Sequence, residues 1–193
     1  MTEASANRQG PGPLFQSRFR ARIVDLPFNG CDYTFKSKGA GARAISLLVE
    51  PDDGSSWLAT FAADDPLANE ALSGIWRTPS PTGLCVIERG TAFLGDVLTP
   101  SEFAVIETCG PIVAMKELIE QRLLLLISPW TITAVSAEGV RWVTDRIAIE
   151  GISVKGVDSG QLIGVSDPGG DESHGFVVDI STGKLIGGGG VTW

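Results

Sequence analysis

The stretch His174-Gly-Phe-Val-Val-Asp-Ile-Ser-Thr-Gly-Lys-Leu-Ile-Gly-Gly188 decides the fold expected for this chain. It holds two short apolar runs, and Ser181-Thr182-Gly183 separates them with residue types that tight turns prefer. Two such runs around a glycine-containing turn are typical of a β-hairpin. Because the same layout recurs through the last third of the chain, the sequence predicts an antiparallel β meander.

Hairpin patterns of this kind occur along most of the chain. The paired runs are 42–50 with 57–62, 84–88 with 91–97, 131–136 with 140–147, 152–157 with 161–166, and 176–180 with 184–186. Prolines, glycines and aspartates separate the runs, as in tight turns. The predicted fold class is all-β: an antiparallel meander of about a dozen short strands with little helix. A two-sheet β-sandwich and a propeller-like arrangement both fit this pattern.

Residues 111–122 are the ambiguous part of the chain. Met115, Lys116 and Glu117 are good helix formers, and Pro111 suits the first position of a helix. The apolar run 123–127, however, is typical of a buried strand. We therefore favour a strand, a charged turn and a second strand over a helix.

The two ends of the chain differ from its middle. Residues 1–13 are polar with no apolar period, which predicts a disordered N-terminal arm. Residues 14–193 are expected to form a single all-β domain. Within it, 14–22 predicts a first edge strand with arginines alternating outward. Residues 187–190 are four glycines, which predict a flexible tail or a wide turn.

Composition limits the function. The net charge is −8 at pH 7, which disfavours nucleic acids and anionic membranes and is compatible with a basic protein partner. Solubility alone also explains such a charge. Cys31, Cys85 and Cys109 show no C-x-x-C spacing, so free thiols are expected and no metal site or other cofactor is predicted. The first twenty residues lack a signal-peptide layout, and the expected location is cytoplasmic.

The segment 123–188 resembles a loosely defined group of uncharacterised bacterial β-rich proteins. The matching elements are Leu-Leu-Leu-Leu-Ile (123–127), Thr-Ala-Val-Ser-Ala-Glu-Gly-Val-Arg-Trp (133–142), Gly-Ile-Ser-Val (151–154) and Phe-Val-Val-Asp-Ile-Ser-Thr-Gly (176–183). The Gly-Val-Arg-Trp hairpin is also similar to strands of quinoprotein-type and WD-type propellers. The resemblance covers about a third of the chain, implies an all-β fold, and implies no activity and no functional residue.

No catalytic residue is predicted. His174 is the chain's one histidine, and strand alternation would send the neighbouring Ser173 to the opposite face, away from any Ser–His contact. Asp167, Asp171 and Glu172 lie in one glycine-rich loop, where a turn with solvated carboxylates is favoured over a calcium site because the spacing of a calcium loop is absent.

Two tryptophans complete the candidate binding residues. Trp130 follows Pro129 at a turn and is the best candidate for an exposed aromatic side chain, and Trp142 lies in the Gly-Val-Arg-Trp hairpin. Tryptophans on β proteins bind sugars or anchor partners, although most pack in cores.

These observations predict a non-enzymatic acidic binding protein, with an immunity- or antitoxin-like role towards a basic partner. The alternative is a small carbohydrate-binding or hydrolytic β protein that uses exposed acids and tryptophans. A third class is an oligomer-forming domain that pairs through an exposed edge strand. The sequence itself leaves the oligomeric state open.

Overall fold

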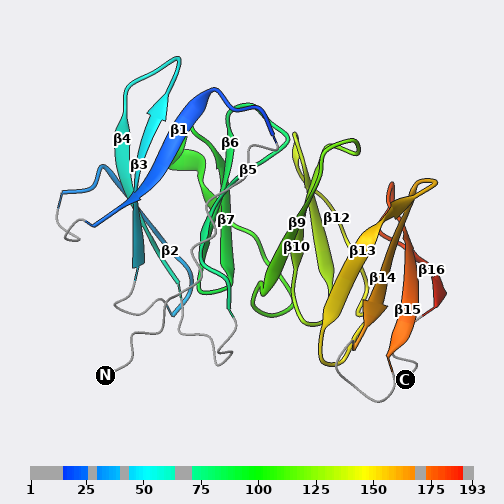
Figure 1. Cartoon of the computed structure of the whole chain (residues 1–193). Helices are drawn as coiled ribbons and strands as arrows, with labels where there is room; N and C mark the ends of the chain where they lie inside the picture. Colours follow the sequence, from blue (N-terminus) through cyan, green and yellow to red (C-terminus); the bar gives the residue numbers. More distant parts are fainter. Residues whose placement is uncertain (1–14, 26–29, 40–43, 64–70, 168–172, 189–193) are drawn as a thin grey trace, which may run out of the picture.

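The computed structural model describes residues 15–25, 30–39, 44–63, 71–167 and 173–188. Within them the strands form four four-stranded sheets, here named A to D in chain order, which follow one another across the molecule (Figure 1). Sheet A comprises β1 (Phe19–Val24), β2 (Tyr33–Lys36), β3 (Ala44–Pro51) and β4 (Trp57–Ala62). Sheet B comprises β5 (Gly74–Arg77), β6 (Gly83–Glu88), β7 (Thr91–Asp96) and β8 (Ala104–Val105).

The second half of the chain supplies the other two sheets. Sheet C comprises β9 (Ala114–Leu118), β10 (Leu123–Ile127), β11 (Ile132–Ser136) and β12 (Gly139–Val143). Sheet D comprises β13 (Ile152–Asp158), β14 (Gln161–Ser166), β15 (His174–Asp179) and β16 (Leu185–Gly188). The one helical element in the described part of the chain is the short 3₁₀-helix η1 (Pro100–Glu102). No helix there has the length and apolar character needed to cross a membrane.

Sheets B, C and D are meanders in which each strand pairs antiparallel with the next. Sheet A differs, because its order is β1-β3-β4-β2 and β2 runs parallel to β4. The β3–β4 hairpin is paired from Val49 with Trp57 to Ala44 with Ala62. This hairpin lies between β1 and β2 in the sheet. Turn residues act locally and therefore do not predict which strands flank the hairpin.

The sheets pack face to face, and the alternation of side chains along each central strand builds three apolar cores. In β6, Leu84 and Val86 belong to the core between sheets A and B, whereas Cys85 and Ile87 belong to the core between B and C. In β10, the even-numbered leucines face sheet B and the odd-numbered residues of 123–127 face sheet D. Both strands are buried on both faces, which explains why their sequences are continuously apolar.

The predicted all-β fold with little helix is confirmed, and its layers pack as in a sandwich, in four sheets. The strand–turn–strand prediction for 111–122 is confirmed by β9 and β10. One prediction is wrong: Gly187 and Gly188 belong to strand β16, because they pair with Val177 and Phe176 of β15. Strand β8 is short, since only Ala104 and Val105 pair with β7. The predicted arm, 1–13, lies outside the described residues.

Candidate binding surfaces at the two ends of the sheets

Trp130 and Asp167 hold the same loop from two sides. The indole Nε1 of Trp130 donates a hydrogen bond to the carbonyl of Ile149 over 2.9 Å. Oδ1 of Asp167 accepts hydrogen bonds from the backbone N–H groups of Ile149 and Glu150. The guanidinium of Arg146 lies 5.4 Å from the centre of the Trp130 ring, which is half-buried. Both candidates therefore stabilise the connection between sheets C and D.

Trp142 is a core residue. Its side chain is only 7% exposed and packs between sheets C and D. Its Nε1 donates a hydrogen bond to the carbonyl of Ile180 over 2.8 Å, which satisfies the polar atom of the buried ring. The ring consequently offers no platform to a ligand in this structure.

The remaining candidates are His174, Asp171 and Glu172. His174 is the exposed first residue of β15, and its carbonyl accepts a hydrogen bond from the Ser166 hydroxyl over 3.1 Å. Asp171 and Glu172 lie outside the described residues. Within the ranges that the structure describes, no three His, Cys, Asp or Glu side chains are grouped to hold a metal ion.

Two hollows lined by carboxylates lie at one end of the sheets. The first has a volume of about 410 Å³, and Asp32 and Asp53 are its acidic lining residues. The second has a volume of about 250 Å³ and is lined by Asp96, Glu102 and Glu138. We name these five residues the acidic end. The linings of both hollows include no lysine or arginine.

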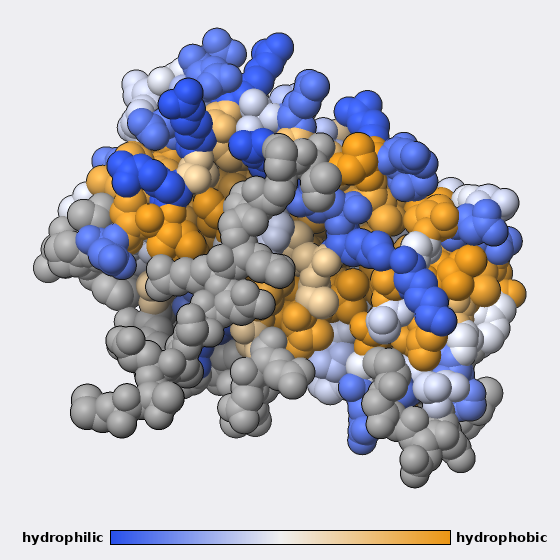
Figure 2. Space-filling model, viewed as in Figure 1, coloured by the Kyte–Doolittle hydropathy of each residue, from blue (hydrophilic) through white to orange (hydrophobic). Residues whose placement is uncertain are grey.

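Strand direction explains why these five carboxylates gather. The first hollow contains the starts of β2 and β4, and the second contains the start of β6 and the end of β7. The β7–η1 connection, 97–100, separates the two hollows and contributes residues to both. This end carries the β3–β4 turn at the top of Figure 1, and the same edge is predominantly hydrophilic in Figure 2. Together the hollows form one acidic surface across sheets A, B and C.

The carboxylates of the acidic end differ in how they are held. Asp96 accepts hydrogen bonds from the Thr82 hydroxyl and from the N–H of Leu98, so its position is fixed by the fold. A hydrogen bond from the Ser136 hydroxyl lowers the pKa of Glu138, whose side chain is exposed. Asp53 lies 3.9 Å from the Arg18 guanidinium, a solvent-exposed pair that contributes little to stability. Glu138, with its exposed side chain and lowered pKa, is therefore the carboxylate of the acidic end best suited to contact a cationic ligand.

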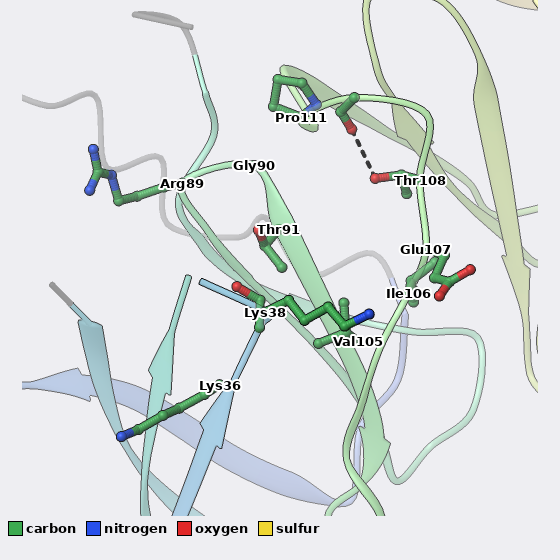
Figure 3. A pocket seen from close by; sticks show the side chains of 12 residues that line it. Lys36, Lys38, Arg89, Gly90, Thr91, Val105, Ile106, Glu107, Thr108 and Pro111 are labelled. Atoms are coloured by element: carbon green, nitrogen blue, oxygen red, sulfur yellow. Dashed lines mark hydrogen bonds between the residues drawn. The ribbon is translucent and has the colours of Figure 1, made fainter. Parts of the chain in front are cut away.

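The opposite end of sheets A and B holds a third hollow, with a volume of about 720 Å³. Lys36, Lys38, Arg89 and Glu107 are its charged lining residues. Figure 3 shows Lys38 crossing the middle of the view towards Val105, whereas Lys36 and Arg89 extend to one side. The basic groups do not converge on one point, so the hollow does not form a compact anion site.

None of the five carboxylates of the acidic end was predicted from the sequence as a binding residue. Asp32, Asp53 and Glu138 lie in connections between strands, Asp96 ends β7, and Glu102 ends η1. Successive strands of a meander run in opposite directions, so this alternation alone would have placed the β6–β7 and β7–η1 connections at opposite ends of sheet B. The placement of sheet A against sheet B carries no comparable signal. The chain matches no known protein-family model and no curated protein sequence.

Proposed function

We propose that this protein is a non-enzymatic binding protein whose acidic end contacts a basic partner protein. The observation that carries this proposal is the gathering of five carboxylates around two adjoining hollows whose linings contain no lysine or arginine. Complementary charge accelerates encounter and selects against acidic partners. The net charge of −8 adds a long-range attraction in the same direction.

The pKa of Glu138 supports binding rather than acid catalysis. A general acid needs a pKa raised towards neutrality. The hydrogen bond from Ser136 shifts the pKa of Glu138 in the other direction, below its ordinary value. A carboxylate kept ionised by a hydroxyl donor serves as a fixed negative charge. An immunity- or antitoxin-like role, in which an acidic protein covers a basic toxin, is one form that such an interaction takes.

The alternative of a carbohydrate-binding or hydrolytic protein has less support. It needs an exposed aromatic platform near carboxylates. Trp142 is buried, and Trp130 is engaged with Ile149 and Arg146 away from the acidic end. The alternative remains a prediction, and a change in tryptophan fluorescence on titration with oligosaccharides would support it.

Affinity capture from native cells tests the proposal with two variants of equal charge. The first combines Asp53→Asn, Glu102→Gln and Glu138→Gln at the acidic end. The matched control combines Glu107→Gln, Glu150→Gln and Asp158→Asn, which lie outside both hollows. Asp96 is left unchanged because its hydrogen bonds support the fold.

We expect one basic protein to be retained by the wild type and by the control, and to be lost from the acidic-end variant. Retention should weaken as salt is raised, because exposed charges are screened within about 10 Å at 0.1 M salt. Equal retention by both variants, or retention of an acidic protein, would contradict the proposal.

A further inference from the structure

Every sheet has two edge strands, and almost all of them carry a charged side chain. Such charges prevent an edge from pairing with another chain, because pairing would desolvate them. The charged edge residues are Arg20 and Arg22 on β1, Lys36 on β2, Arg77 on β5, Lys116 and Glu117 on β9, Arg141 on β12, and Lys155 and Asp158 on β13. Strand β8 has no charge but consists of only two residues.

Among the described edge strands of more than two residues, β16 is the one that carries no charge. Its sequence, Leu-Ile-Gly-Gly, has four residues and no charge, and Ile186 is 53% exposed. A Cβ on Gly187 would approach only Val177, at 3.8 Å, so this part of the edge carries little bulk. An edge strand that lacks charged and bulky side chains can accept a further strand.

The outer face of sheet D extends this apolar surface. A cross-strand row runs from Gly156 through Ile163 and Val177 to Gly187. Ile163 and Val177 point away from the core between sheets C and D, which contains their neighbours Leu162 and Val178. Figure 2 shows hydrophobic residues at the surface over this part of the molecule. A strand added at β16 would lengthen this apolar row.

We propose that two copies of this chain join edge to edge through β16, antiparallel about a two-fold axis, and form a continuous eight-stranded sheet. A two-fold axis places one strand against its own copy, so the same uncharged edge supplies both sides of the contact. Each copy carries −8, so the two copies repel at long range, but β16 brings no charged side chain into the interface. The edge of β1, by contrast, carries Arg20 and Arg22, so pairing with its own copy would place like charges near each other.

The contact is small, which sets its expected strength. Stable interfaces bury about 800 Å² on each partner, and a pair of four-residue strands with one exposed isoleucine each buries much less. We therefore expect a weak dimer that dissociates on dilution. The acidic end lies on sheets A, B and C, so it stays open in the dimer, and this proposal is independent of the proposed function.

Sedimentation equilibrium across a concentration series tests the dimer. Ile186→Lys adds a charge to the edge, and Val143→Lys is the matched control on the edge strand β12, where residue 143 is 46% exposed and Arg141 is already present. We expect the wild type and Val143→Lys to dimerise at high concentration and Ile186→Lys to stay monomeric. A wild type that is monomeric throughout, or equal dimerisation of all three proteins, would overturn the proposal.

A measurement on the unaltered chain removes the dependence on folding of the variants. In the dimer, the outward backbone N–H groups of β16 form hydrogen bonds, so their hydrogen exchange should slow as concentration rises. The amides of edge strand β12 serve as the reference. Dimerisation without a change at β16 would show that another surface joins the copies and would also overturn the proposal.

Discussion

Trp142 of β12 lies against Gly183 in the turn before β16, and its ring fills the space that a side chain at residue 183 would need. A Cβ on Gly183 would lie 2.8 Å from Cδ2 and Cε3 of the indole. Gly183 also has a φ of +75°, a backbone conformation that glycine adopts most easily. The indole Nε1 hydrogen bond to Ile180 ends in the same turn. This contact ties the last hairpin of sheet D to sheet C.

Gly183→Ala should therefore destabilise the protein more than Gly160→Ala. Gly160 has a nearly equal φ of +77°, and a Cβ there would meet nothing within 4 Å. The control isolates the backbone cost, about 1–2 kcal/mol. We expect Gly183→Ala to cost about 1–3 kcal/mol more because the ring must move. Urea unfolding measures the free energy of unfolding of both variants. Equal losses of stability would mean that the Trp142 ring moves away without a cost.

Asp167→Ala should loosen the loop between sheets C and D. It removes the acceptor of the Ile149 and Glu150 N–H groups, at an expected cost of about 1–3 kcal/mol. Asp167 has a φ of +52°, which asparagine tolerates better than alanine does. Asp167→Asn keeps an oxygen acceptor and should retain most of the stability. Faster hydrogen exchange at the two amides in Asp167→Ala alone is the expected result, whereas unchanged exchange would contradict it.

The three cysteines should differ in reactivity according to their burial. Cys109 is exposed, Cys31 is half-buried and Cys85 is fully buried. Burial raises the pKa of the Cys85 thiol to about 12. A maleimide reagent at neutral pH should label Cys109 first and Cys85 only after denaturation, as mass spectrometry of peptides would show. Rapid labelling of Cys85 in the folded protein would contradict the packing between sheets B and C.

The same thiol predicts a loss of stability at high pH. Because the folded-state pKa lies above the ordinary value of 9.0, the unfolded chain ionises first as pH rises. The contribution of Cys85 is complete below about pH 9 and falls as the pH rises towards 12. Cys85→Ala should lack this part of the fall in urea-unfolding experiments. Identical pH profiles above 9 for the two proteins would refute the assignment.

Glu117→Gln should stabilise the protein at neutral pH. Burial raises the pKa of Glu117 above 4.5, an effect that the charge of Arg77 partly offsets, and Oε2 has no hydrogen-bond partner among the described residues. The folded state therefore favours the neutral carboxyl. Its contribution to the stability of the protein is complete below the ordinary pKa and is lost as the pH rises through the raised folded-state pKa. The melting temperature of Glu117→Gln should exceed that of the wild type at about pH 7 and match it near about pH 4.

Glu120→Gln is the control for this comparison. Glu120 lies three residues further on, in the turn after β9, and its side chain is exposed. Its replacement removes the same charge from the same region without relieving any burial. A similar rise in melting temperature in both variants would show that net charge, rather than the environment of Glu117, is responsible.

Local patterns predicted most strands because hairpins pair residues that are close in sequence. The run 123–127 illustrates this: five apolar residues have no helical or strand period, yet their length and flanking turn favour a strand, which β10 confirms. The candidate site was predicted less well. Trp142, a predicted binding residue, is buried, and its contact with Gly183 joins positions forty-one residues apart, which local patterns do not show.

The sequence alone determined the fold class, the hairpins and the turns between them, since glycine turns and alternation act over a few residues. Only the tertiary structure decided that sheets stack in four layers, that β2 joins β4 in parallel, that five carboxylates meet at one end, and that β16 remains an uncharged edge. These features depend on which faces and strand ends come together, and that outcome is set by the burial of apolar surface between segments far apart in the chain.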